Sequence, residues 1–280
     1  MVVALALPPV LYLVHVGGWP LCLLLMALAI VGVAEFRGLC ERARWSGFWP
    51  AAFVAAPLLV LDAQLPGIAL GRLAVAGALF GGLVWALFQG VEPARAVVGW
   101  SVTLAGSLYL GLPLGLALSL RYREAALGNT LSVGPLDLSR GTLWLVLALA
   151  LTWACDAAAY LVGRSFGRRP FLHRISPRKT VEGAIAGVLA AAAAALVVGP
   201  AVGLTGLLAL PLGIAGGIGA LLGDLAESLL KRAGDVKDSG RLFPGHGGVL
   251  DRLDSLLFVI VVVYYGGELA LALQGWVLGW

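Results

Sequence analysis

Long apolar runs follow one another along this chain, and short polar segments separate them. A helix needs about 20 mostly apolar residues to cross a hydrocarbon layer roughly 30 Å thick. The runs are continuous rather than alternating, which favours helices over the strands of a barrel. We therefore predict an all-α, polytopic integral membrane protein with about nine transmembrane helices, at residues 4–18, 19–35, 48–63, 68–88, 98–120, 142–163, 181–199, 203–222 and 254–273.

The first of these segments is the least regular. It is short and contains Pro8 and Pro9, and the chain turns at Gly17 and Gly18 into the second segment. A re-entrant first segment would reduce the expected count to eight. A cleaved signal peptide is not expected, because such a peptide begins with basic residues and no Lys or Arg precedes Arg37.

The composition supports the membrane assignment. Residues of the set AVILMFWYC make up 60% of 280 positions and only 12% are charged, while the mean hydropathy is +0.97. This apolar content exceeds what a soluble core of that length requires. Frequent Gly and runs such as Ala190 to Ala195 are typical of membrane helices that pack closely. The three cysteines lie far apart without a CxxC pair, so neither a disulfide framework nor a zinc site is predicted.

The basic residues predict the orientation in the membrane. With nine spans, the segments after the second, fourth, sixth and eighth lie on one side and hold 15 of the 19 Lys and Arg residues. That side is expected to be the cytoplasm, which also places the N-terminus inside. The opposite side holds only Arg121, Arg123 and Arg140. Topology thus explains the net charge of +4, and without aromatic residues interleaved among the basic ones no nucleic-acid binding is predicted.

Polar residues are distributed unevenly between the two halves. Residues 1–140 are predicted to be an N-terminal scaffold of transmembrane helices, and residues 141–280 a C-terminal catalytic region with cytoplasmic motif loops. Between Asp156 and Asp254 lie eight of the fifteen acidic residues and eleven of the nineteen basic ones. A charge at membrane depth costs about 2.5 to 3.5 kcal/mol on insertion scales, so such charges usually mark a functional site.

The first polar cluster begins inside the sixth predicted span. Asp156 and Tyr160 are four residues apart and therefore share a helix face. A glycine-rich, basic loop follows at 163–169. Hydroxyl groups, backbone N–H groups and a basic side chain that meet at a helix N-terminus form an anion site. Ser176, Lys179 and Thr180 are groups of this kind ahead of the next span, and Glu182 is an acidic residue at its start. The alternatives are a structural interhelical hydrogen bond for Asp156 and a purely topological role for the basic residues.

The second polar cluster ends the eighth predicted span. Asp224, Glu227 and Ser228 project from one helix face and offer the oxygen ligands that suit Mg²⁺. Lys231 and Arg232 follow and can receive phosphate oxygens. The alternative for each single residue is a solvated helix end or a salt bridge. Further polar and glycine positions come next, namely Lys237, Asp238, His246, Gly247, Gly248, Asp251, Arg252 and Asp254.

Residues 228–254 resemble the signature of the phosphatidate cytidylyltransferase family, also called CDP-diacylglycerol synthases. The resemblance rests on the order of Ser228, Lys231 and Arg232, then Lys237 to Gly240, then Pro244 to Asp254, over 27 residues without a gap. It extends upstream to about residue 150. Val181 departs from the family, whose members commonly carry an aromatic residue there, which leaves any stacking role at that position in doubt.

The resemblance implies an integral membrane enzyme, expected in the bacterial inner membrane with its active site facing the cytoplasm, that condenses CTP with phosphatidate. It also implies a homodimer and a Mg²⁺ centre held by Asp224 and Asp251, with a monovalent cation such as K⁺ alongside. The expected catalytic residues are Asp224, Lys231, Arg232, Lys237, Asp238, His246, Asp251 and Arg252. The expected substrate-binding residues are Asp156, Tyr160, Ser176, Lys179, Thr180, Glu182, Ser228, Gly247, Gly248 and Asp254.

Two other functions fit parts of the pattern. A CTP-dependent polyprenol or lipid-alcohol kinase would use similar metal and phosphate ligands but transfer the γ-phosphoryl group. An ion-coupled transporter would explain an intramembrane Asp156 and glycine-rich helices. The missing inverted repeat and the crowding of charge on one membrane face argue against a transporter.

Overall fold

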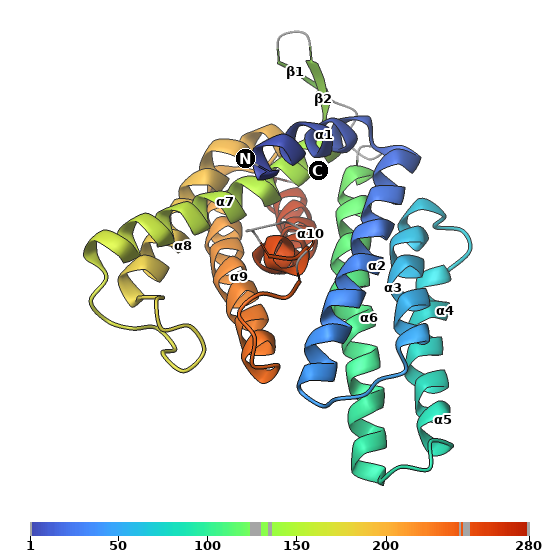
Figure 1. Cartoon of the computed structure of the whole chain (residues 1–280). Coiled ribbons are helices and arrows are strands. Elements are labelled where there is room, and N and C mark those ends of the chain that lie inside the picture. Colours follow the sequence, from blue (N-terminus) through green and yellow to red (C-terminus); the bar gives the residue numbers. More distant parts are fainter. Residues whose placement is uncertain (1, 124–129, 134–135, 241, 243–246, 279–280) are drawn as a thin grey trace. The chain divides into compact units, whose positions relative to one another are not determined.

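The computed structural model describes residues 2–123, 130–133, 136–240, 242 and 247–278, and it is predominantly α-helical (Figure 1). The N-terminal elements are α1 (Val2–Val16), α2 (Gly18–Arg42), α3 (Trp49–Gln64), α4 (Leu70–Ala76), the π-helix Gly77–Gly81, α5 (Gly82–Leu87) and α6 (Pro93–Arg121). An antiparallel hairpin of β1 (Thr130–Val133) and β2 (Leu136–Ser139) follows, with Thr130 opposite Ser139. The remaining elements are α7 (Arg140–Phe166), α8 (Val181–Val198), the 3₁₀-helix Gly199–Val202, α9 (Gly206–Ala233) and α10 (Leu250–Leu278).

The all-α, polytopic architecture agrees with the prediction, but the count of about nine spans is not confirmed. Among the described residues, seven helices are long and apolar enough to cross a membrane, namely Gly18–Arg42, Leu70–Leu87, Pro93–Arg121, Arg140–Phe166, Val181–Val202, Gly206–Ala233 and Leu250–Trp276. Helix α3 is apolar but has only 16 residues, and α1 has 15 with two prolines inside. At about 1.5 Å per residue, helices of that length fall short of a layer roughly 30 Å thick.

The chain forms two compact units, which we describe separately. The first comprises Met1–Ser119 and Leu229–Leu253, and the second comprises Leu120–Ser228 and Asp254–Trp280. The segment Leu229–Leu253 therefore belongs with the N-terminal helices. The proposed functional division at residue 140 remains a prediction.

Glycines let the helices of the first unit approach closely. A Cβ at Gly111 of α6 would lie 2.7 Å from the backbone of Ala56 in α3, and one at Gly115 would lie 2.6 Å from the carbonyl oxygen of Leu59. The entrance to α3 is fixed by a hydrogen bond of 2.7 Å from the backbone N–H of Phe48 to Thr103 Oγ1. Such backbone proximity is the expected use of small residues in membrane helices.

The second unit repeats this packing mode. A Cβ at Gly183 of α8 would lie 2.7 Å from the carbonyl oxygen of Ala159 in α7. A Cβ at Gly217 of α9 would lie 2.9 Å from Cα of Val188 in α8. The predicted close packing of the glycine- and alanine-rich helices is therefore confirmed. It brings polar residues of α7, of the loop before α8 and of α9 together around one pocket.

Candidate functional site

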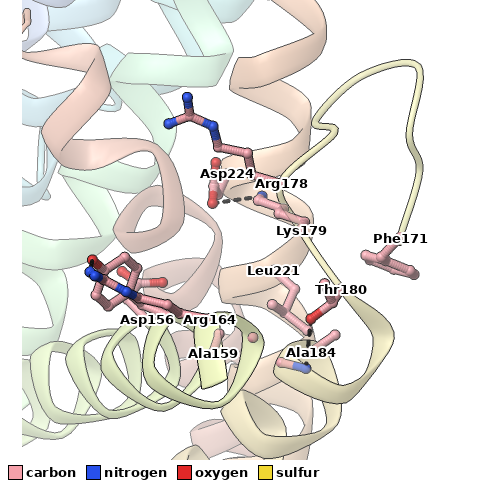
Figure 2. Close-up of a pocket in the computed structure, with 13 residues that line it drawn as sticks. Asp156, Ala159, Arg164, Phe171, Arg178, Lys179, Thr180, Ala184, Leu221 and Asp224 are labelled. Atoms are coloured by element: carbon pink, nitrogen blue, oxygen red, sulfur yellow. Dashed lines mark hydrogen bonds and ion pairs between the residues drawn. The ribbon is translucent and has the colours of Figure 1, made fainter. Parts of the chain in front are cut away.

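A pocket with a volume of about 470 Å³ lies in the second unit (Figure 2). This volume is within the range of about 300 to 1,000 Å³ that is usual for small-molecule sites. Its polar side chains come from α7, the loop 167–180 and the end of α9. Those side chains are Asp156, Tyr160, Arg164, Arg178, Lys179, Thr180 and Asp224, and Phe171 is the aromatic residue beside them.

The loop between α7 and α8 is held by its own backbone. The Phe171 N–H donates to the carbonyl of Lys179 at 2.7 Å, and Pro170 pairs with Thr180 as an isolated antiparallel bridge. Gly167 is required here, because a Cβ at that position would lie 2.6 Å from Cγ2 of Thr180. These contacts place Lys179 at the pocket wall.

Helix α8 begins at Val181, directly after Thr180, whose hydroxyl accepts a hydrogen bond of 3.2 Å from the Gly183 N–H. This is an N-cap, which satisfies one of the first donors of the helix. Glu182 accepts hydrogen bonds of 3.1 and 3.2 Å from the N–H groups of Arg168 and Arg169. In this structure the Glu182 carboxylate therefore orders the loop.

Lys179 and Asp224 form the central ion pair of the pocket. Lys179 Nζ lies 2.6 Å from Asp224 Oδ2, and the two side chains are 20% and 36% exposed. An ammonium has three donors, so Lys179 keeps donors for a further acceptor in the pocket. The Ser228 hydroxyl donates to Asp224 Oδ1 at 3.4 Å. Both carboxylate oxygens of Asp224 consequently keep lone pairs for a further ligand.

The pocket combines both signs of charge. Arg164, Arg178 and Lys179 supply cations, while Asp156 and Asp224 supply carboxylates. The Arg164 guanidinium donates to the Tyr160 hydroxyl at 2.8 Å. Guanidinium and ammonium groups bind phosphate oxygens, and carboxylates bind a hard cation. This set of groups suits a phosphate-bearing ligand that arrives with a divalent metal ion.

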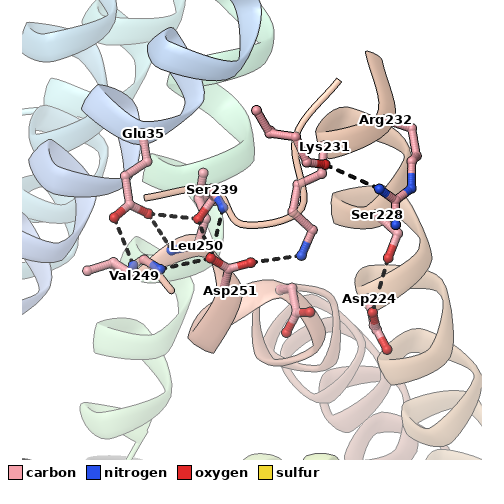
Figure 3. A network of polar contacts seen from close by, with 12 residues as sticks. Glu35, Asp224, Ser228, Lys231, Arg232, Ser239, Val249, Leu250 and Asp251 are labelled. Atoms are coloured by element: carbon pink, nitrogen blue, oxygen red, sulfur yellow. Dashed lines mark hydrogen bonds and ion pairs between the residues drawn. The ribbon is translucent and has the colours of Figure 1, made fainter. Parts of the chain in front are cut away.

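A second polar network lies in the first unit, around Asp251 at the start of α10 (Figure 3). Asp251 Oδ2 accepts hydrogen bonds from the Ser239 N–H at 2.9 Å, from the Ser239 hydroxyl at 2.8 Å and from the Gly248 N–H at 2.8 Å. Asp251 Oδ1 accepts one from Lys231 Nζ at 2.7 Å, and these two side chains are 8% and 15% exposed. Asp251 is thus a buried carboxylate with most of its acceptor capacity in use.

The donor sets fit Mg²⁺ in part. Among the described residues, no three His, Cys, Asp or Glu side chains gather as a metal site. Mg²⁺ often uses only one or two protein carboxylates and completes its shell with water and phosphate, so a set of three is not needed. Asp224 is suitable because it is partly exposed and keeps lone pairs on both oxygens. Asp251 can contribute only through Oδ1, because Oδ2 already accepts three hydrogen bonds.

The structure brings some of the predicted residues together. Those that line the pocket are Asp156, Tyr160, Lys179, Thr180 and Asp224. Those in the network around Asp251 are Lys231 and Gly248, with Gly247 adjacent at φ 81°. Those exposed to solvent are Arg232, Lys237, Asp238 and Arg252. Ser176 and Glu182 do not line the pocket, Asp254 accepts the N–H of Ser255 at 2.7 Å, and His246 lies outside the described residues.

Sequence reasoning missed several polar residues. Arg164 and Arg178 line the pocket, although they could be interpreted as orientation signals alone. Glu35 was missed entirely, and it bonds to Ser239, Val249 and Leu250. Glu35 ends the second predicted apolar run, so the rule that singled out Asp156, a carboxylate within an apolar segment, could have found it.

The fold and the pocket define a class of protein: a helical protein, consistent with a polytopic membrane protein, that has a pocket lined by side chains of both charges. The sequence model of the cytidylyltransferase family matches residues 1–269. The chain is 36% identical over 279 residues to a phosphatidate cytidylyltransferase of Synechocystis sp., covering 90% of each chain. It is 35% identical over 265 residues to one of Brucella suis, covering 92% of this chain and 88% of the relative. One from Bacillus subtilis is 43% identical over 129 residues, covering 45% and 47%.

The chain belongs to the cytidylyltransferase family. It is therefore a nucleotidyltransferase, and the resemblance seen in residues 228–254 is confirmed. The seven long apolar helices in the described part of the chain are consistent with a membrane protein.

Proposed function

We propose that this protein is a phosphatidate cytidylyltransferase, which joins CTP and phosphatidate to form CDP-diacylglycerol and pyrophosphate. The observation that carries the proposal is the pocket lined by Arg164, Arg178 and Lys179, in which Lys179 pairs with the Asp224 carboxylate. Relatives that bear this name and align with about nine-tenths of the chain support the same conclusion.

The proposed reaction needs little proton transfer. A phosphate oxygen of phosphatidate attacks the α-phosphorus of CTP, a new P–O bond forms, and the bond from the α-phosphorus to the bridging oxygen breaks. Pyrophosphate leaves with that oxygen. Because the nucleophile is already an anion, the protein must chiefly bring two polyanions together and offset their repulsion. Lys179, Arg164 and Arg178 line the pocket and are the groups proposed to offset this repulsion.

Mg²⁺ is the proposed cofactor, with Asp224 and Asp251 as its protein ligands and K⁺ as an accompanying cation. When bound, Mg²⁺ supplies positive charge that stabilises the leaving pyrophosphate. Asp224 offers lone pairs at the pocket, and Asp251 offers Oδ1. A homodimer embedded in membrane lipid is proposed from the family resemblance.

Radiolabelled CTP tests the reaction directly. Purified protein in detergent micelles with phosphatidate should transfer label from [α-³²P]CTP into the lipid phase and none from [γ-³²P]CTP, because the γ-phosphorus leaves with pyrophosphate. Label from the γ position in a polyprenol or a lipid alcohol would instead indicate a kinase. Absence of any transfer under both conditions, with folded protein, would overturn the enzymatic proposal and favour a transporter.

We propose further that the pocket faces the cytoplasm. The support is the asymmetry of basic residues, since the loop between α7 and α8 carries Arg168, Arg169, Arg174, Arg178 and Lys179. CTP is a cytosolic solute, so this orientation would give it direct access. The hairpin between α6 and α7 would then lie on the external side.

Cysteine labelling tests this orientation on the two loops that flank α7. After replacement of the three buried native cysteines, Thr130→Cys should react with an impermeant thiol reagent added to intact cells, and Arg174→Cys should not. Arg174→Cys should become reactive once the membrane is permeabilised. The reverse pattern would place the pocket outside and separate it from cytosolic CTP.

A further inference from the structure

We propose that Glu35 is a positioning residue that fixes the two described ends of the loop between α9 and α10, at Ser239–Gly240 and Gly247–Val249, and through them the carboxylate of Asp251. This inference rests on the proposed function, in which Asp251 serves the reaction. Glu35 lies on α2, within the part of the chain predicted to be scaffold (Figure 3).

Glu35 caps the start of α10 from a distant part of the sequence. Its Oε1 accepts the Val249 N–H at 2.9 Å, and its Oε2 accepts the Leu250 N–H at 2.8 Å. These N–H groups stand at the N-terminus of the helix, where no carbonyl of the same helix can accept them. A negative side chain is also favoured there by the helix dipole. Glu35, 214 positions from Val249 in the sequence, thus acts as an N-cap for α10.

Glu35 also reaches the other end of the loop. The Ser239 hydroxyl lies 3.1 Å from Glu35 Oε2 and 2.8 Å from Asp251 Oδ2. This hydroxyl has a single proton, so it joins the two carboxylates by a shared hydrogen bond. The Ser239 N–H and the Gly248 N–H both donate to Asp251. The Glu35 carboxylate therefore binds both ends of the loop. The same two ends donate hydrogen bonds to Asp251.

Two glycines show that the loop is shaped around this carboxylate. At both Gly240 and Gly248, the atoms nearest to an added Cβ are carboxylate atoms of Glu35, so a side chain at either position would displace that carboxylate from its present contacts. Neither glycine has the positive φ that would explain its presence by backbone conformation. Their role is to let the loop backbone close on Glu35 from two sides.

The geometry connects Glu35 to Asp251 through three short paths: the Ser239 hydroxyl, the Gly248 segment and the first turn of α10. A displacement of the loop would move Asp251 Oδ1 and the Lys231 ammonium that it binds. Errors of about 1 Å in a reacting constellation can cost a hundredfold in rate. Partners that orient metal ligands typically contribute about 10- to 100-fold in metal affinity or activity.

The test compares Glu35→Gln with Glu41→Gln. Glutamine retains the size of Glu35 but presents an N–H₂ group to a backbone N–H, so one of the two cap contacts is lost. Glu41 lies on the same helix and forms an ion pair with Arg37 at 2.7 Å, in which both side chains are 46% exposed. The Glu41→Gln variant therefore controls for the loss of a negative charge from α2. Cytidylyl transfer is measured on purified, folded protein across a Mg²⁺ series.

We expect Glu35→Gln to lower kcat by about 10- to 100-fold and to raise the Mg²⁺ concentration for half-maximal rate. The KM for CTP should change by less than about threefold, and Glu41→Gln should match the wild type. If kcat per folded molecule and the Mg²⁺ dependence are unchanged in Glu35→Gln, Glu35 is only a helix cap and the proposal is wrong.

Two further measurements cover the remaining outcomes. If Glu35→Gln does not fold, Ser239→Ala removes only the link between the two carboxylates, and it must still raise the Mg²⁺ requirement for the proposal to stand. Hydrogen exchange reports the ends of the loop independently of catalysis: the N–H groups of Ser239, Val249 and Leu250 should exchange faster in Glu35→Gln than in Glu41→Gln. If the wild-type protein shows no cytidylyl transfer but exchange is still faster in Glu35→Gln, Glu35 anchors the loop and the proposed reaction is wrong. If exchange is equal in Glu35→Gln and Glu41→Gln, the proposed role of Glu35 is wrong.

Discussion

Asp224→Asn should lower kcat for cytidylyl transfer by at least about a hundredfold while the protein remains folded in the membrane. The substitution keeps the shape of the side chain but removes the charge that would bind Mg²⁺ and that now pairs with Lys179 at 2.6 Å. Charge stabilisation by a metal ion contributes several kcal/mol, and each 1.36 kcal/mol is about tenfold in rate. The measurement is kcat at saturating CTP over a range of Mg²⁺.

A matched control is available on the same helix-loop segment. Asp235 is exposed and has φ 51°, a conformation that Asn tolerates well, so Asp235→Asn should retain activity and stability. If Asp224→Asn keeps near wild-type activity at limiting Mg²⁺, Asp224 is not a metal ligand. Asp251→Asn is a poorer test, because an N–H₂ group in that buried position would face the donors of Ser239, Gly248 or Lys231.

The fold could be predicted to the level of its apolar helices, because membrane spans follow from hydropathy alone. The ends of these helices could not be predicted. Helix α9 continues to Ala233 and α2 to Arg42, beyond the apolar runs that ended at 222 and 35. Outside the hydrocarbon layer, helix length depends on capping and tertiary contacts rather than on hydropathy. The start of α10 at Leu250, set by Glu35, is an example.

The site could be predicted where its parts are local in sequence. Asp156 and Tyr160 share a face of α7, and Lys179 and Thr180 precede α8, so spacing and helix start were sufficient. The ion pair between Lys179 and Asp224 joins residues from different helices and was not foreseen. The rule for a carboxylate in an apolar segment could have found Glu35, but its partners could not be foreseen, since they lie more than 200 positions away and no periodic pattern encodes them.

Lys231→Gln should lower kcat/KM by about 10- to 100-fold, whereas Arg232→Gln should change it by less than about threefold. The sequence suggested that these neighbours act together on substrate phosphates, but their environments differ. Lys231 is 15% exposed and donates to Asp251 at 2.7 Å, while Arg232 is exposed and donates to the Val236 carbonyl at 3.3 Å. A charge-assisted hydrogen bond is worth about 1.5 to 3 kcal/mol, which gives the expected loss for Lys231.

The pair of variants separates three roles for this basic segment. Each removes one positive charge from the same end of α9, so any effect on membrane orientation should be equal and is measured by the cysteine-labelling assay. Activity within about twofold of wild type in both variants would leave only a topological role. Equal losses in both would mean that Arg232 also contacts a phosphate despite its exposure. A loss confined to Lys231→Gln, with Lys231→Arg failing to restore activity, would indicate a compact ammonium at Asp251 Oδ1, because a planar guanidinium is larger and cannot replace it in a buried contact.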